Sequence, residues 1–207
     1  LDGNSRYGAF LHPLMGFTPD GTPLGTVHAE VWTRRDEPPP PKSDRRQKRK
    51  STPIEEKESV RWLEAYRHAR EEAERAPATH FVCVADSEAD IYELLEESQK
   101  EPKRLDWIVR ACQDRALRKE DGGARVSEAS AKHLRERVLM EDVWFTQTLS
   151  VRGREAKVAC EDRGRRQPRQ SRTTEVEVRA ARVTLRAPWR HDRKLRDVSV
   201  NVVLVTE

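Results

Sequence analysis

The sequence has 207 residues, which is enough for one large domain or two small ones and for a hydrophobic core of ordinary size. Only 35% of the residues are hydrophobic and 37% are charged, so part of the chain is expected to be extended, solvated or in contact with a charged partner. No apolar run approaches the length of a transmembrane helix, the first residues show no signal-peptide pattern, and a net charge of +4 does not by itself identify a nucleic-acid-binding protein.

The first strong pattern along the chain is a β-hairpin. Residues 9–17 and 24–32 are predicted strands, and the turn-forming run Thr18-Pro19-Asp20-Gly21 lies between them. Residues 34–50 are rich in proline and basic side chains, which predicts an exposed loop.

A helix is predicted over residues 53–75. The run Thr52-Pro53-Ile54-Glu55 fits a capping box with proline at the first helical position. Four apolar side chains recur at helical spacing behind it: Trp62, Tyr66, Ala69 and Ala73. Trp62, and Trp107 further along, are interpreted as core side chains.

An α/β alternation follows this helix. Residues 80–85 form a short apolar run, which predicts a strand buried on both faces. Residues 87–100 are a predicted helix, residues 107–111 a strand, residues 112–125 a basic loop and residues 127–137 a short helix.

The last part of the sequence is predicted to be β structure. Its strand-like segments are residues 143–151, 155–160, 174–185 and 198–205, and a change of parity at Ala180-Ala181 indicates a bulge or bend. The order of elements predicts an α/β sheet domain followed by an antiparallel β insertion or appended domain.

Charge is distributed unevenly along the chain. Residues 55–101 contain fourteen acidic and six basic side chains, a net of −8, and residues 163–196 contain twelve basic and three acidic side chains, a net of +9. This separation suggests that a polyanion faces the second region. The alternative is that both regions are solvated surfaces. The three cysteines Cys83, Cys112 and Cys160 are widely spaced and odd in number, which favours a reducing cytoplasm over a disulfide framework or a zinc site.

Asp86 is the main candidate for chemistry. It follows directly after the predicted buried strand, where open α/β sheets place ligand-binding groups. A carboxylate held there suits a hard cation such as Mg²⁺, and two-metal phosphoryl-transfer sites collect such carboxylates from separate elements. The alternative is that Asp86, or Ser87 with Asp90, only caps the following helix.

The segments YGAFLH, IEEKES, VADSEADIYELL and WIVR occur in this order along the chain. Together they resemble motifs of the insertion-sequence-4 family of bacterial DDE transposases. VADSEADIYELL at residues 84–95 resembles the family's D-R-E-A-D-I segment, with Ser87 in place of the usual Arg. YGAFLH with residues 21–32 is similar to its paired strands, IEEKES with Trp62-Leu63 to its E-K-E-S…W-L helix, and WIVR at residues 107–110 with Arg115 to its V-V-R segment. The resemblance is strongest over residues 5–118 and continues more weakly over residues 172–207.

This resemblance implies a fold and a function. The implied fold class is α/β, with a partial RNase H-like catalytic core over residues 1–124 and a partial, mainly β insertion domain over residues 125–207. The implied function is cut-and-paste DNA transposition by metal-dependent strand cleavage and transfer, with Asp86 as the second carboxylate of the triad and Mg²⁺, or Mn²⁺ in its place, as cofactor. The implied partner is double-stranded DNA, bound by a cytoplasmic, nucleoid-associated homodimer without a membrane. The alternatives are a non-catalytic nucleic-acid-binding remnant of a transposase and a metal-dependent nuclease with the same core.

The resemblance also indicates which residues contact DNA and where the other two carboxylates of the triad are expected. Arg110 and Arg115 match basic residues that contact transposon ends, and the other candidate DNA-binding residues are Arg118, Lys119, Arg163, Arg165, Arg166, Arg169 and Arg172. For the cluster from Arg163 to Arg172, solubility explains the charge as well as phosphate contact does. The first Asp of the triad is expected upstream of Leu1 and the Glu, in a Y-x-x-R-x-x-x-E helix, beyond Glu207. The chain begins without Met and ends after an apolar run, so we expect it to be the centre of a longer protein and inactive alone.

Overall fold

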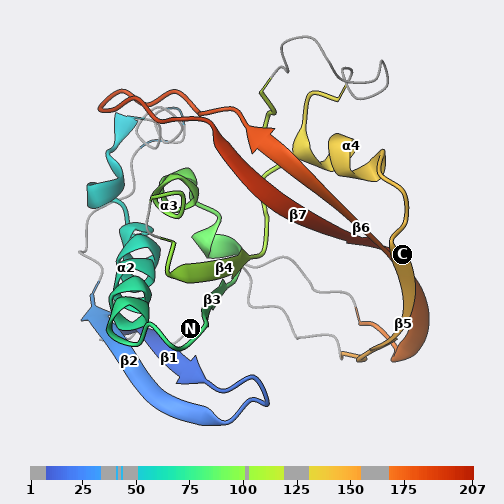
Figure 1. Cartoon of the computed structure of the whole chain (residues 1–207), viewed down its shortest axis with the longest axis horizontal. Helices are drawn as coiled ribbons and strands as arrows, with labels where there is room; N and C mark the ends of the chain where they lie inside the picture. Colours follow the sequence, from blue (N-terminus) through green and yellow to red (C-terminus); the bar gives the residue numbers. More distant parts are fainter. Residues whose placement is uncertain are drawn as a thin grey trace. The chain divides into compact units, whose positions relative to one another are not determined.

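The structure is a computed structural model that describes residues 8–33, 41, 43, 51–100, 103–118, 131–154 and 168–207. These residues form a mixed α/β structure that is mostly strands, with three α-helices (Figure 1). They divide into two compact units, Leu1–Gln113 with Ala187–Val198 and Asp114–Arg186 with Ser199–Glu207. The boundary predicted near residue 124 lies outside the described residues. None of the described helices is long and apolar enough to cross a membrane.

The predicted hairpin is confirmed at the start of the first unit. Strands β1 (Phe10–Phe17) and β2 (Pro23–Trp32) pair antiparallel. In the turn, the Gly21 N–H donates to the Thr18 carbonyl at 2.9 Å, and Gly21 has a φ of 90°, which only glycine adopts without strain. The turn residues identified in the sequence therefore make this connection.

Helix α2 (Val60–Arg75) begins later than predicted. A short 3-10 helix, η1 (Ile54–Glu56), precedes it, and the extended backbone of Lys57 separates the two. The predicted start of an α-helix at Pro53 is wrong, because Pro53 is the N-cap position of η1 and no side-chain hydrogen bond caps it there. The Glu55 carboxylate, which would have to reach back to the start of the helix, instead accepts hydrogen bonds from Arg193 at 2.6 and 2.7 Å.

The hairpin contacts α2 through polar and aromatic side chains. The Arg61 guanidinium donates to Glu30 at 3.1 Å and lies 3.6 Å from the centre of a Trp32 ring. His12 lies edge-on to Trp62 at 4.5 Å, and burial lowers the pKa of His12. These contacts fix the hairpin against the helix.

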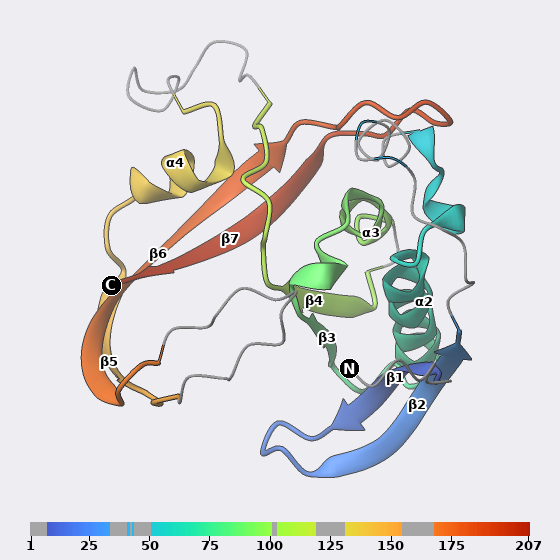
Figure 2. The same ribbon diagram turned by 180° about the vertical axis from the view of Figure 1, so that it is seen from behind.

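Strands β3 (Phe81–Ala85) and β4 (Leu105–Val109) form a parallel pair beside α2 (Figure 1 and Figure 2). One face of this pair packs against the core of the unit, and burial raises the pKa of the Cys83 thiol and that of Tyr66, the latter to about 12. The core residues are Ile54, Leu63, Tyr66, Ala73, Ala89, Ile91, Leu94 and Leu105, with Trp62 and Trp107 packed against them, which confirms the predicted place of both tryptophans.

The prediction that the strand at residues 80–85, now β3, is buried on both faces is wrong. Val84 is 72% exposed and Ile108 61% exposed, because the core formed by the described residues covers only one side of the pair. The helix predicted over residues 87–100 is also shorter. It consists of the 3-10 helix η2 (Ser87–Ala89) and, after an extended residue at Ile91, helix α3 (Tyr92–Glu97).

The second unit is mainly antiparallel β structure. Helix α4 (Leu134–Leu139) precedes a sheet in the order β5 (Phe145–Val151), β6 (Arg172–Leu185), β7 (Val198–Thr206). The predicted parity change is confirmed: the buried side chains of β6 are Val176 and Val178, then Ala181, Val183 and Leu185. The predicted strand at residues 155–160 lies outside the described residues, as does the loop at residues 34–50 apart from positions 41 and 43.

Candidate functional site

Asp86 lies where the sequence placed it, directly after β3, and its side chain is exposed. Its Oδ1 atom accepts a hydrogen bond from the Glu88 backbone N–H at 2.8 Å, so Asp86 caps η2. The capping role weighed from the sequence is therefore present. Capping occupies one carboxylate oxygen and leaves the other able to bind a ligand.

Asp90 has a different role, which sequence reasoning did not assign. Its side chain is only 6% exposed, and its Oδ2 atom accepts from the backbone N–H groups of Cys112 and Gln113 at 2.8 and 2.9 Å. The Gln113 side chain donates back to the Asp90 carbonyl at 3.2 Å. Asp90 therefore ties the segment after β3 to the segment after β4. In the sequence, this role is indicated only by the position of Asp90 as the second aspartate of the D-S-E-A-D run at residues 86–90.

Asp86 directly follows β3 and Arg110 directly follows β4, so the pairing of the two parallel strands places these residues side by side. The Arg110 N–H donates to the Ala85 carbonyl at 3.3 Å, and its guanidinium Nη2 donates to the Ser87 hydroxyl at 3.2 Å. Ser87 stands where the D-R-E-A-D-I motif has Arg. Its hydroxyl thus accepts a hydrogen bond from Arg110, which follows the neighbouring strand. A carboxylate and a guanidinium are presented at one edge of the β3–β4 pair, a combination suited to a metal-bound phosphodiester.

The set of metal ligands at this edge is incomplete. A two-metal site requires several carboxylates. Among the described residues, no group of three or more His, Cys, Asp or Glu side chains is positioned to hold a metal ion. Asp86 supplies one candidate ligand, so these residues do not form a metal site by themselves.

The other predicted DNA-binding residues are spread over the second unit or lie outside the described part. Arg118 is exposed and its N–H donates to the Thr184 carbonyl at 2.9 Å, whereas the side chain of Arg115 is half-buried. The Arg169 guanidinium donates to the Arg152 carbonyl at 2.9 Å. Four candidates lie outside the described residues: Lys119, Arg163, Arg165 and Arg166.

Arg172 is already paired with a carboxylate. Its guanidinium donates to both oxygens of Glu207, with 2.6 Å between Nη2 and Oε2. This pairing, together with a hydrogen bond from Thr174, lowers the pKa of Glu207 to about 2. A phosphate would have to compete with Glu207 for this arginine.

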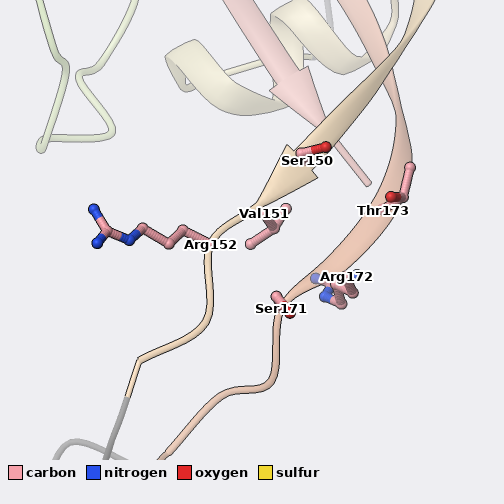
Figure 3. Close-up of a pocket in the computed structure, with 6 residues that line it drawn as sticks. All are labelled: Ser150, Val151, Arg152, Ser171, Arg172 and Thr173. Atoms are coloured by element: carbon pink, nitrogen blue, oxygen red, sulfur yellow. The ribbon is translucent and has the colours of Figure 1, made fainter.

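A shallow pocket of about 490 Å³ lies where β5 ends and β6 begins (Figure 3). It is lined by Ser150, Val151, Arg152, Ser171, Arg172 and Thr173. The strands approach closely beside it, since a Cβ on Gly153 would lie 2.9 Å from the Ser171 backbone nitrogen. The lining combines hydroxyl groups with Arg152, whose side chain extends away from the hairpin in Figure 3.

Some basic side chains of residues 163–196 form ion pairs with acidic side chains of residues 55–101 inside the first unit. The segment Ala187–Val198, called here the basic strap, belongs to the same unit as the acidic region. Arg190 pairs with Glu93 at 2.7 Å, and Arg193 pairs with Glu55 at 2.6 Å. A polyanion would therefore have to compete with the chain's own carboxylates for these two arginines.

Comparison of the sequence with models of known protein families gives no match, and comparison with curated proteins gives none. The interpretation of the site therefore rests on the geometry of Asp86, Asp90 and Arg110 and on the order of the sequence motifs.

Proposed function

We propose that this chain is the central part of a DDE transposase and that Asp86 is one of its catalytic metal ligands. The observation that carries the proposal is the exposed Asp86 carboxylate at the end of β3, with Arg110 held beside it by Ser87. The proposed fold of the first part is RNase H-like, and the β-rich second part is the insertion domain.

The arrangement of β3 and β4 supports this proposal. In parallel sheets, ligand-binding groups gather at the carboxyl ends of the strands, and Asp86 and Arg110 both directly follow such an end. Among the described residues, the β1–β2 sheet and the β3–β4 sheet have two strands each, and sheets of two strands are marginally stable alone. Asp86 is the one carboxylate of the triad that we assign to this chain.

The proposed reaction is phosphoryl transfer on double-stranded DNA. When bound, Mg²⁺, or Mn²⁺ in its place, supplies the Lewis acid for cleavage at the transposon end and for attack of the freed 3′ hydroxyl on target DNA. Asp86 would bind this metal. Arg110 would hold a phosphodiester next to it, and a homodimer on DNA in the bacterial cytoplasm would bring two ends together.

Asp86→Asn in the full-length protein tests the metal role. Asn is as good an N-cap as Asp, so the free energy of unfolding should change by less than about 0.5 kcal/mol. Binding to transposon-end DNA should persist, because the proposed contacts come from arginines. Cleavage and strand transfer should both be lost, since the charge needed by the divalent cation is gone.

The assay measures thermal unfolding, gel-shift affinity and cleavage on one transposon-end substrate. Asp106→Asn is the matched control, because Asp106 is an exposed aspartate on β4 that pairs with His80 at 2.7 Å. Cleavage by Asp86→Asn at the rate of the control would show that Asp86 is only a helix cap.

A non-catalytic nucleic-acid-binding protein is the second candidate. It is favoured by the single carboxylate at the site, because the described residues contain no metal-binding group of three or more side chains. A metal-dependent nuclease with the same core would also lose cleavage in Asp86→Asn, but it would not transfer strands. The strand-transfer readout therefore separates the transposase from the nuclease.

A further inference from the structure

Histidine side chains join the β1–β2 hairpin to helix α2, and the two elements lie side by side in both views (Figure 1 and Figure 2). The rings of His28 on β2 and His68 on α2 are stacked, with 3.9 Å between their centres and 20° between their planes. His12 on β1 lies edge-on to Trp62 of α2 at 4.5 Å. Each strand of the hairpin therefore contacts the helix through an imidazole ring.

The order of the hairpin depends on its contact with α2. Partly buried positions alternate with exposed ones along both strands, as expected for a hairpin with one covered face. The partly buried residues are His12, Leu14, Gly16, His28, Glu30 and Trp32. Among the described residues the hairpin is a sheet of two strands, and such a sheet is marginally stable alone. Loss of the contact with α2 would therefore loosen both strands.

The two stacked rings differ in the partners available to a proton charge. His68 Nδ1 lies 3.5 Å from a carboxylate oxygen of Glu71 on the same helix. In the described part of the chain no carboxylate forms an ion pair with His28, and Glu30, on the same face of β2, is bound by Arg61 at 3.1 Å. A charge on His28 would therefore meet the charge on His68 without a compensating partner.

Other charged or titratable groups surround this contact. They face the rings or lie within two helical turns of His68 on the same side of α2. They are His12 of β1, Glu30 of β2, Arg61, Glu64, Glu72 and Arg75 of α2, and Glu88 of η2. His28 and Arg61 disfavour a proton on His12, whereas Glu30 and Glu88 favour it.

We propose that His28 and His68, with His12 beside them, form a proton-sensitive contact that holds the β1–β2 hairpin on α2 while the rings are neutral and releases it in acid. When both stacked rings are neutral, their faces pack against each other. When both are protonated, two like charges lie 3.9 Å apart between the hairpin and the helix and repel each other. Histidine suits this role because its charge changes between about pH 5 and pH 8.

His12 acts in the same direction as the stacked pair. Burial lowers the pKa of His12 below its ordinary value of 6.5, so the folded state binds this proton less readily than the unfolded state. The stability that neutral His12 contributes is present above pH 6.5 and is lost as pH falls through the lowered value. The proposal goes beyond the proposed function, because it involves neither Asp86 nor a metal nor DNA.

Hydrogen–deuterium exchange of the complete 207-residue chain tests the proposal. Exchange is measured by peptide at about pH 7.5 and about pH 5.5 and corrected for the intrinsic effect of pH. Peptides of β1 and β2 should exchange at least about fivefold faster at the lower pH, the factor that two like charges about 4 Å apart give even in bulk water. Peptides of β3 and β4 should change little. The Glu97 carboxylate remains ionised at both values, because its pKa lies below 4.5.

Two variants test the rings directly. His28→Phe keeps an aromatic ring in the stack but cannot bind a proton, so the acid-induced increase should fall to about twofold or less. His68→Phe should have the same effect, because the repulsion requires both charges. The matched control is His80→Phe, since His80 is 75% exposed, pairs with Asp106 at 2.7 Å and should leave the full increase in place. Thermal unfolding at the higher pH checks the fold of each variant, and either folded Phe variant is sufficient for the test.

Three results would overturn the proposal. The first is equal exchange of the hairpin at both pH values in the unaltered chain. The second is an acid-induced increase that a folded His28→Phe or His68→Phe variant retains in full, which would show that the rings only pack. The third is an increase shared equally by β3 and β4, which would report unfolding of the whole unit. The separate cleavage assay on Asp86→Asn distinguishes these failures from failure of the proposed metal role.

Discussion

Two aspartates of one short motif have opposite surroundings at the scale of single residues. Asp86 is exposed and accepts one backbone hydrogen bond, whereas Asp90 is buried and accepts two. A buried carboxylate that satisfies two N–H groups has a structural role that an exposed cap does not have. Asp90 is thus a positioning residue. It holds the segment after β4, and with it Arg110, near the proposed metal ligand.

Replacement of Asp90 should destabilise the protein more than replacement of Asp86. Asp90→Ala is expected to lower the free energy of unfolding by about 2 kcal/mol, because two charge-assisted hydrogen bonds are lost. Asp86→Ala should cost about 1 kcal/mol, the usual value of an N-cap. Asp90→Asn keeps one acceptor oxygen, so its loss of unfolding free energy should lie between those of Asp90→Ala and Asp86→Ala. Chemical denaturation measures all three, and a smaller loss in Asp90→Ala than in Asp86→Ala would contradict the role assigned to Asp90.

At the scale of elements, one bidentate ion pair joins α2 to α3. Arg67 donates to both oxygens of Glu97 at 2.8 Å, and the Glu97 side chain is 11% exposed. Hydrogen bonding from Arg67 lowers the pKa of Glu97 below its ordinary value of 4.5. Because the folded state binds this proton less readily than the unfolded state, the pair stabilises the protein above about pH 4.5, and this stability is lost as pH falls through the lowered value.

Glu97→Gln should therefore reduce stability at pH 7 and weaken the decline of stability below about pH 4.5. The measurement is the melting temperature of the variant and of the unaltered protein over a pH series. Glu74→Gln is the matched control, because Glu74 pairs with Arg70 within α2 alone and such pairs contribute about 0.5 kcal/mol or less. Parallel curves for Glu97→Gln and the unaltered protein would exclude a link between Glu97 titration and stability.

At the scale of the whole molecule, the proposed chemistry is distributed unevenly. The first unit holds Asp86, Arg110 and the basic strap, and the second unit holds Arg118, Arg169 and Arg172. Several of the cations pair with carboxylates or carbonyl groups, so the sum of basic residues overstates the surface open to DNA. The described part of both units provides one candidate metal ligand at the site and no group of three.

The isolated 207-residue chain should therefore not cut DNA. One inferred carboxylate cannot hold the two metal ions that strand cleavage requires, with Mg²⁺ or with Mn²⁺. The measurement is nicking of supercoiled plasmid by the purified chain, with Asp86→Ala as the control. Metal-dependent nicking that disappears in Asp86→Ala would show that this chain holds the other metal ligands and that we have misplaced the remaining carboxylates of the triad.

Local sequence patterns predicted the elements whose structure depends on near neighbours. The Thr18–Gly21 turn, the strands of the hairpin and the parity change in β6 follow from residue preferences over a few positions. The place of Asp86 after β3 follows from the same local logic. Only the tertiary structure decided that Glu55 binds Arg193 rather than capping a helix, that Asp90 binds the segment at Cys112, and that Arg190 is neutralised by Glu93. These partners lie between 22 and 138 residues apart in the sequence, and the chain brings them together only when its core packs.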